Sequence, residues 1–387
     1  MAIVMKFGGT SVADPPAIRQ VTSIIRKNLG KHPVVVVSAL AHVTNLLLEI
    51  ADKKSYSKSR KNLAEIEGRH WRVLRGFSSK TQGLVAPQVS ELFRELRKTA
   101  KTIVKKNARK DRDLLASFGE RLSSWLLAGA LLDQGIRTER VDSRELVVTD
   151  SAFGNAEVNF AKTKWNFAKK VAPLVRKNIV PVITGFIGRD AKGNTTTLGR
   201  GGSDYSASLA AMALNAKEIQ IWKDVPGFMT ADPRVVKEAR VIGSLSFQEA
   251  AELSYFGAKV IHPKTIYPAV KKNIPVHILN TFAPENRGTL ILGEPKKVSC
   301  SIFPVRAISY KKNVTVINVS SLRMLGPYGF LERLFRIFSE YKTPVDVVAT
   351  SEVSVSMTIA DSSFQPGLIR NLKKIGMVEV KKSHVIL

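Results

Sequence analysis

The chain has 387 residues, 44% of them hydrophobic, and a mean hydropathy of −0.02, values typical of a soluble globular protein large enough for two domains. Apolar runs such as residues 33–38 are too short to span a bilayer, and no secretory signal pattern is recognisable. The one cysteine, Cys300, excludes an intrachain disulfide, so we expect a protein of a reducing compartment. The net charge of +28 fits nucleic-acid binding or anionic substrates, but the basic clusters lie in one helical region without aromatic interleaving, zinc-ligand spacing or an RNA-binding motif, which favours solvated helix faces.

The N-terminal segment carries the first candidate for phosphate binding. Residues 2–7 are predicted to form a buried strand that ends in Lys6-Phe7-Gly8-Gly9-Thr10-Ser11. A strand followed by paired glycines and a helix is a common way to hold a phosphate, although the lysine precedes the glycines and the motif is no Walker loop. The alternative for Lys6 is an exposed lysine at a strand end, and its glycine neighbours favour the phosphate contact.

A second buried strand is predicted at residues 34–37, a β-branched run typical of a parallel strand covered on both faces. It is followed by Thr44 and Asn45. Ligands of open α/β sheets lie at such carboxyl ends. These two residues are therefore either ligand contacts or a helix cap, and the sequence leaves both alternatives open.

Residues 46–110 are predicted to be helical and basic, without recognisable chemistry. The next segment, from Ser117, places Glu120 and Arg121 at the start of a strongly apolar helix. Charges in that position are either a surface ion pair or site residues, and the residues alone favour a surface pair.

The most informative stretch is Thr195-Thr-Thr-Leu-Gly-Arg200-Gly-Gly-Ser203-Asp204, which runs directly into an apolar helix. Glycines let backbone N–H groups approach an anion, a helix N-terminus attracts negative charge, and Arg200 supplies a planar fork for a carboxylate or phosphate. A polar turn before a helix capped by Ser203 or Asp204 is the alternative. The arginine beside two glycines favours an anion site.

The order of elements predicts an αβα sandwich on a mainly parallel sheet, since strands alternate with helices over about 290 residues. A loop at 223–234 again follows a strand, and His262, followed by a proline, is interpreted as a structural turn. Predicted strands lie at 137–142, 146–149, 180–184, 218–222, 275–279 and 289–292, and predicted helices at 14–29, 159–178 and 246–255.

Beyond a linker at 294–312, the pattern indicates a second, smaller domain of ferredoxin-like βαββαβ order. Its strands are predicted at 314–319, 345–349, 353–359 and 378–382, with helices at 328–338 and 365–374. Residues 383–387 look like the start of a further strand.

Taken together, the motifs resemble those of aspartokinases, amino-acid kinases with regulatory ACT domains, over essentially the whole chain. The motif at 195–204 is specific to that family within the wider amino-acid kinase fold. The other matching segments are Lys6 to Ser11, Val43 to Asn45, Ser117 to Glu120, Asp224 to Gly227, Asp232 to Arg234, Phe256 to Lys259, Met324 to Leu331 and Val345 to Ser354.

The resemblance implies that ATP, as its Mg²⁺ complex, phosphorylates the β-carboxylate of L-aspartate, the first step toward lysine, threonine and methionine. It implies no dedicated metal-ligand set. It assigns catalysis to Lys6 and Asp204; aspartate binding to Thr44, Glu120, Phe186, Arg200, Gly201, Gly202 and Ser203; and ATP binding to Lys6, Gly8, Gly9, Lys223, Asp224, Met229, Arg234 and Lys259. The family often has Thr at position 223 and Tyr at 229.

For the rest of the chain, the resemblance implies a catalytic domain at 1–293, an ACT domain at 313–382 and the beginning of a second ACT domain at 383–387. It also implies a homodimer formed through ACT domains, in the cytoplasm or, after removal of a transit peptide, the plastid stroma, with no membrane and no specific nucleic-acid partner. L-Lysine would be the effector, near Met324, Gly329, Phe330, Leu331, Asp346, Ser351 and Glu352. The alternatives are another amino-acid kinase, or a non-catalytic amino-acid sensor or polyanion-binding protein.

Overall fold

The computed structural model describes residues 2–52, 56–106, 108–258, 260–293, 305–325 and 328–386. Contacts divide the chain into two compact units. The first comprises residues 1–255 with 259–306, and the second comprises 256–258 with 307–387.

The first unit is built on an eight-stranded sheet with the order β3-β5-β2-β1-β8-β10-β11-β9. Every pairing in it is parallel except that of β10 with β11. The strands predicted to be buried are buried along their whole length in β1, β2 and β5. The strands are β1 Ile3–Phe7, β2 Pro33–Val37, β3 Thr138–Val141, β5 Val180–Thr184, β8 Ile219–Lys223, β9 Ser244–Ser246, β10 Val276–Asn280 and β11 Thr289–Leu292.

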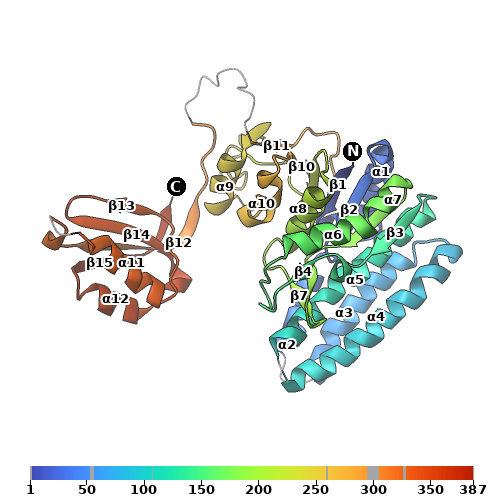
Figure 1. Cartoon of the computed structure of the whole chain (residues 1–387), viewed down its shortest axis with the longest axis horizontal. Coiled ribbons are helices and arrows are strands. Elements are labelled where there is room, and N and C mark those ends of the chain that lie inside the picture. The colour runs from blue at the N-terminus through green and yellow to red at the C-terminus, as the bar shows by residue number, and fades with distance from the viewer. Residues whose placement is uncertain are drawn as a thin grey trace. The chain divides into compact units, whose positions relative to one another are not determined.

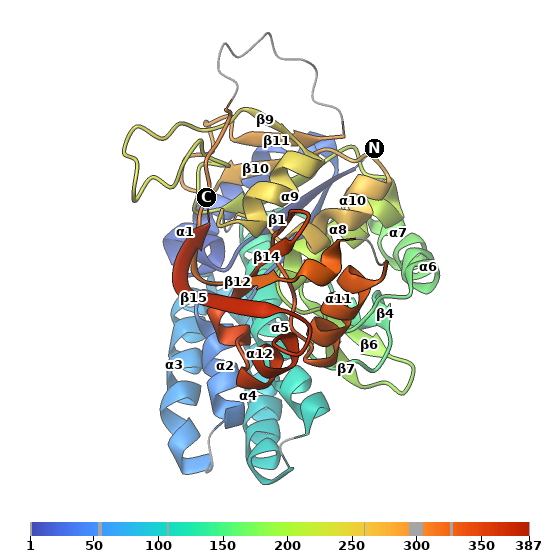
Figure 2. The same ribbon diagram turned by 90° about the vertical axis from the view of Figure 1, so that its left-hand side faces the viewer.

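Helices cover both faces of this sheet, and Figures 1 and 2 both show α3, α4 and α5 running side by side. On β1, the side chains of Ile3, Met5 and Phe7 join the core shared with α1 and α5. The intervening Lys6 faces α8, because successive side chains of a strand point to opposite faces. The helices are α1 Pro15–Lys27, α2 Val43–Asp52, α3 Tyr56–Leu74, α4 Ser79–Lys106, α5 Arg109–Asp133, α6 Phe160–Lys170, α7 Ala172–Arg176, α8 Gly202–Leu214, α9 Phe247–Tyr255 and α10 Pro263–Lys271.

A small second sheet, β4-β6-β7, differs from the prediction. Its strands are β4 Val148–Thr149, β6 Ile187–Asp190 and β7 Thr195–Thr197, and β6 and β7 form an antiparallel hairpin. The three threonines that open the anion-site motif thus form a strand, which pairing with the neighbouring β6 stabilises. The helix predicted at 159–178 is in fact two helices, α6 and α7.

The second unit is a four-stranded antiparallel sheet with the order β13-β14-β12-β15, accompanied by two helices. Phe330, Leu334 and Phe338 of the amphipathic α11 pack into its core. The elements are β12 Lys311–Ser320, α11 Phe330–Glu340, β13 Val348–Thr350, β14 Ser354–Ala360, α12 Pro366–Leu372 and β15 Met377–Ile386, so Ser383 to Ile386 continue β15. The predicted fold class, an αβα sandwich followed by a ferredoxin-like unit, is confirmed.

Candidate active site

A pocket of about 790 Å³ opens where the central parallel strands end. Four of these carboxyl ends contribute to it: Lys6 from β1, residues 38–42, 44 and 45 after β2, Phe186 after β5 and Lys223 from β8. Strand β1 connects to β2 on one side, and its other neighbour, β8, connects onward to the strands on the opposite side. Ligands of open α/β sheets bind where the connections of adjacent strands diverge in this way. The pocket also falls within the size range of small-molecule sites.

A buried aspartate between two lysines forms the polar centre of the pocket. Lys6 Nζ lies 2.7 Å from Asp204 Oδ1, and Lys223 Nζ lies 3.0 Å from Asp204 Oδ2. The Lys223 ammonium also donates a hydrogen bond to the carbonyl oxygen of Val260. Lys6 is 5% exposed, so the alternative of an exposed strand-end lysine is wrong.

The two lysines stabilise the ionised form of Asp204. Burial alone would raise the pKa of Asp204, but the charges of Lys223 and Lys6, with their hydrogen bonds, lower it to about 2. Burial lowers the pKa of Lys6 and the charge of Lys223 lowers it further, while Asp204 opposes both effects. Asp204 is therefore ionised across the physiological range.

Helix α8 begins beside this centre, but not with the predicted cap. Gly201 is the N-cap residue, with φ +68°, and no side chain caps the helix. A Cβ at Gly201 would lie 2.7 Å from Thr265 Cγ2, so both conformation and space call for glycine. Ser203 and Asp204 instead lie buried in the first turn of α8 and line the pocket, whereas Arg200 is exposed at its rim.

Glu120 and Arg121 lie within α5 rather than at its start, and the prediction of a surface pair is wrong. Helix α5 begins at Arg109, so Glu120 lies about three turns into the helix. The side chains of Glu120 and Arg121 are 3% and 5% exposed. Glu120 lines the pocket, with its Oε2 buried and without a hydrogen-bond partner among the described residues. Burial raises the pKa of Glu120 to about 8, against the opposing effects of the Ala39 backbone and Lys6.

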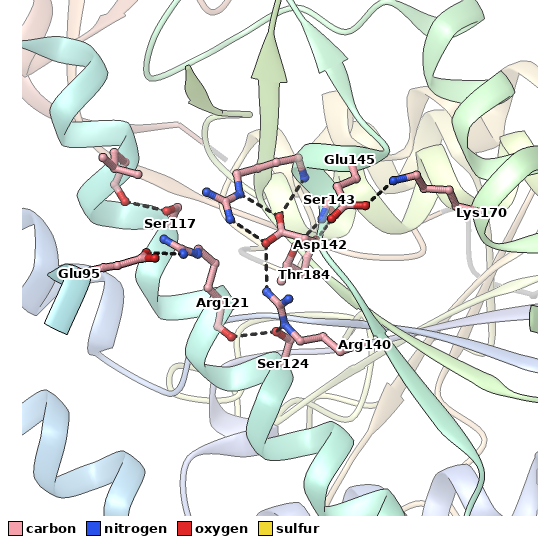
Figure 3. A network of polar contacts seen from close by, with 12 residues as sticks. Glu95, Ser117, Arg121, Ser124, Arg140, Asp142, Ser143, Glu145, Lys170 and Thr184 are labelled. Atoms are coloured by element: carbon pink, nitrogen blue, oxygen red, sulfur yellow. Dashed lines mark hydrogen bonds and ion pairs between the residues drawn. The ribbon is translucent and has the colours of Figure 1, made fainter. Parts of the chain in front are cut away.

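Arg121, the next residue, points to the other side of α5 and into a separate polar network (Figure 3). Its guanidinium forms an ion pair with Glu95 at 2.6 Å. In the same network, Asp142 forms ion pairs with Arg140 at 3.0 Å and with Arg144 at 2.9 Å. The network borders the site, since the Ser143 hydroxyl donates to the carbonyl of Thr184, the last residue of β5.

The loop after β2 forms another wall of the pocket. Thr44 and Asn45 both line it, and since α2 begins at Val43, Thr44 lies inside the first turn rather than in a cap position. Gly9 lies against this loop, because a Cβ there would be 2.8 Å from the carbonyl oxygen of Ala39. Gly8 does not line the pocket, and its N–H donates to the Trp222 carbonyl at 3.0 Å.

Phe186, predicted to contact aspartate, lines the pocket in a left-handed backbone conformation with φ +69°. Its N–H donates to Ser206 Oγ at 3.0 Å, and that hydroxyl in turn donates to the carbonyl of Gly202 at 2.9 Å. A Cβ at Gly202 would lie 2.6 Å from Phe186 Cδ2. Gly202 thus lets α8 start directly beside the end of β5.

Besides Gly8, three of the predicted ATP-binding residues do not line the pocket as the structure describes it. Asp224, Met229 and Arg234 follow β8 in the loop beyond Lys223, and Arg234 forms an ion pair with Asp232 at 2.7 Å. Lys259 lies outside the described residues.

The predicted effector residues all belong to the second unit. Phe330 is buried in its core, as a packing role requires, whereas Leu331 is 42% exposed and the core-packing alternative is wrong for it. Asp346 forms an ion pair with Lys311 at 2.5 Å. Gly329 is the N-cap of α11 with φ +88°, Met324 is half-buried, and Ser351 and Glu352 are exposed.

Sequence reasoning missed one carboxylate in the pocket wall, Asp113. It lies on α5 seven residues before Glu120, a spacing that places both on one helix face and could have revealed it. Among the described residues no group of three or more His, Cys, Asp or Glu side chains could hold a metal ion. Nor is any helix in the described part of the chain both long and apolar enough to cross a bilayer.

Comparison with known proteins identifies the family. Residues 1–280 match the model of the amino acid kinase family. Aspartokinase 1 (chloroplastic) of Arabidopsis thaliana is 37% identical over 99% of this chain and 69% of its own length. Lysine-sensitive aspartokinase 3 of Escherichia coli is 35% identical over 98% of this chain and 85% of its own length.

Solved structures give the same result. The structure of E. coli aspartokinase III in complex with aspartate and ADP (R-state) covers 99% of this chain and 86% of its own, with a TM-score of 0.85 and 35% identity. The structure of the same enzyme with lysine and aspartate (T-state) covers 98% of this chain and 85% of its own, with a TM-score of 0.82 and 35% identity.

Proposed function

Because the chain belongs to the amino acid kinase family and is one of its aspartokinases, we propose that the pocket at the ends of β1, β2, β5 and β8 transfers the γ-phosphoryl group of ATP to the β-carboxylate of L-aspartate. The products are ADP and 4-phospho-L-aspartate. The observation that carries this proposal is the Lys6–Asp204–Lys223 centre beside the Arg200-Gly201-Gly202 turn.

The charge arrangement suits phosphoryl transfer without a general base. The attacking β-carboxylate is already ionised at neutral pH, so one of its oxygens forms the new bond to phosphorus while the bond to the ADP oxygen breaks. Asp204, with a pKa of about 2, is a poor proton acceptor. Its role is to hold the ammonium groups of Lys6 and Lys223 where negative charge gathers in the transition state.

Mg²⁺ is proposed to enter as part of the substrate, on the ATP phosphates. In the pocket, Asp204 is already engaged by two lysines, so it is a weak candidate for a resident metal ligand. By resemblance, the Gly8–Gly9 backbone contacts phosphate, and the N–H of Gly9 is the better placed of the two, since that of Gly8 donates to Trp222. Asp224, Met229, Arg234 and Lys259 are proposed for the rest of the nucleotide.

The aspartate end of the pocket is proposed to use Arg200 for the α-carboxylate and Glu120 for the ammonium group. Two features of Glu120 support this: an unpartnered carboxylate oxygen among the described residues and a pKa raised to about 8 by burial. A bound ammonium group would donate a hydrogen bond to the unpartnered oxygen, and its positive charge would favour the ionised form of Glu120. Thr44, Phe186, Gly201, Gly202 and Ser203 complete the wall around the substrate.

Regulation by L-lysine through the second unit is proposed from the resemblance and from the lysine complex of the E. coli enzyme. The proposed contacts are Met324, Gly329, Phe330, Leu331, Asp346, Ser351 and Glu352. Pairing of two chains through ACT domains, and a location in the cytoplasm or the plastid stroma, belong to the same proposal, without a membrane or specific nucleic-acid partner.

The test is ADP release from MgATP with L-aspartate, with L-glutamate as the control substrate. We expect aspartate-dependent turnover that is lost in Lys6→Ala and Asp204→Ala and kept in Lys217→Ala, an exposed lysine before β8. Folded wild-type protein without aspartate-dependent ADP release would overturn the proposal.

A further inference from the structure

Asp113 joins three segments of the pocket wall through a single carboxylate oxygen. Its Oδ2 accepts hydrogen bonds from the backbone N–H of Thr197 at 2.7 Å and of Gly154 at 2.9 Å. The residue is 5% exposed and lines the pocket from α5. Burial raises its pKa, and the two N–H donors oppose that rise. Burial of a carboxylate costs free energy, which these two hydrogen bonds offset.

The segment that Asp113 holds is the one that carries Arg200. Thr197 is the last residue of β7, and the chain passes from it through Leu198 and Gly199 to Arg200. The other flank of this turn rests on the 152–156 loop: Ala156 N–H donates to the Thr197 carbonyl at 2.9 Å, and a Cβ at Gly199 would lie 2.5 Å from Asn155 Oδ1. The turn is therefore fixed between α5 and this loop.

Arg200 depends on that fixation for its position. Its side chain is exposed and forms no ion pair within the described part of the chain. The backbone of the turn therefore sets the point from which its guanidinium reaches the pocket. Asp113 and Glu120 lie about two turns apart on the same face of α5, roughly 10 Å along the axis.

From this geometry we propose that Asp113 is a positioning residue, which sets the distance between Arg200 and Glu120 and so selects substrates that carry both an α-carboxylate and an ammonium group. This inference rests on the proposed function. Helix α5 presents Glu120 directly and fixes Arg200 through the hydrogen bonds of Asp113. The same helix thereby positions the residues proposed to bind both the ammonium group and the α-carboxylate of the substrate.

The test compares Asp113→Ala with Asp113→Asn, which retains an acceptor oxygen. We expect Asp113→Ala to raise KM for L-aspartate about 10- to 100-fold, with KM for MgATP changed less than about twofold. Asp113→Asn should stay within about threefold of wild type, since it preserves the acceptor. Asp111→Ala, a neighbouring carboxylate outside the pocket wall, is the matched control. Thermal melting shows whether each variant is folded.

A substrate fragment separates positioning from a general structural role. 3-Aminopropanoate keeps the ammonium group and the acceptor carboxylate but lacks the α-carboxylate that Arg200 would bind. Its inhibition constant against L-aspartate should therefore be the same in wild type and Asp113→Ala. Equal weakening of aspartate and 3-aminopropanoate, or an Asp113→Asn variant as impaired as Asp113→Ala, would overturn the inference. If wild type itself lacks aspartate-dependent turnover, the proposed function fails instead.

Discussion

Lys223 Nζ lies 3.0 Å from Asp204 Oδ2, on the oxygen that Lys6 leaves free, so the aspartate carboxylate holds one lysine on each side. Position 223 is often threonine in the family that this chain resembles. The threonine side chain is several bonds shorter than that of lysine, and its hydroxyl carries no charge. The additional lysine therefore gives this site one more positive charge than the common pattern.

We expect Lys223→Thr to lower, but not abolish, activity. The variant loses a cation near the phosphates, which should raise KM for MgATP about tenfold, equivalent to about 1.4 kcal/mol, while Lys6 and Asp204 still catalyse transfer. Initial-rate kinetics with Lys217→Thr as control would check this. An unchanged KM for MgATP would show that Lys223 does not approach the phosphates.

Binding of L-aspartate should weaken as the pH falls below about 8. Glu120, with its pKa raised to about 8 by burial, must lose a proton before it can pair with the substrate ammonium group. The dissociation constant should then rise by up to about tenfold per pH unit between pH 8 and pH 6, where the substrate keeps its charges. Calorimetry at several pH values measures this, together with one proton released per aspartate bound at low pH.

Glu120→Gln provides the control for that pH dependence. The variant should bind aspartate weakly, and its dissociation constant for aspartate should not change between pH 8 and pH 6. It should bind succinate, which lacks the ammonium group, nearly as well as wild type does. Equal loss of affinity for aspartate and succinate would contradict a role of Glu120 in ammonium binding.

The same substitution should stabilise the unliganded protein at high pH. A carboxyl whose folded pKa is raised from 4.5 to about 8 contributes stability that is fully present below about pH 4.5 and is lost as the pH rises through 8. At pH 9 Glu120→Gln should therefore increase the free energy of unfolding by about 3–5 kcal/mol relative to wild type, with a much smaller difference at pH 5. Urea unfolding at both pH values is the measurement, and an equal effect at both would show that burial of the charge is not the cause.

Lysine sensitivity should increase when Lys311 is replaced. Lys311 Nζ lies 2.5 Å from Asp346, so an effector ammonium group that uses Asp346 must compete with a lysine of the chain itself. Lys311→Met should lower the lysine concentration for half-inhibition about tenfold and leave the uninhibited rate unchanged. The exposed neighbour Lys312→Met is the control. Higher resistance to lysine in Lys311→Met would contradict competition at Asp346.

The sequence predicted the parts of the pocket wall that follow the parallel strands better than the part that α5 contributes. Lys6, Gly9 and Lys223 are found because each follows or ends a buried strand, and parallel strands gather their carboxyl ends at one edge. Glu120 was misplaced because α5 extends well before its apolar part, so that the charge lies in mid-helix and only packing against the β2 loop buries it. Asp113 was missed for a similar reason, since its partners Gly154 and Thr197 are distant in sequence.

The spacing of Asp113 and Glu120 on α5 also has an evolutionary consequence. A helix turns by about 100° per residue, so inserting or deleting one residue between them would turn Glu120 away from the pocket. Arg121, which now faces Glu95, would shift by the same angle and lose its partner. Between these two carboxylates the chain can exchange residues of similar size, but it cannot change its length, and sequence alignments of related enzymes should be free of gaps in residues 113–121.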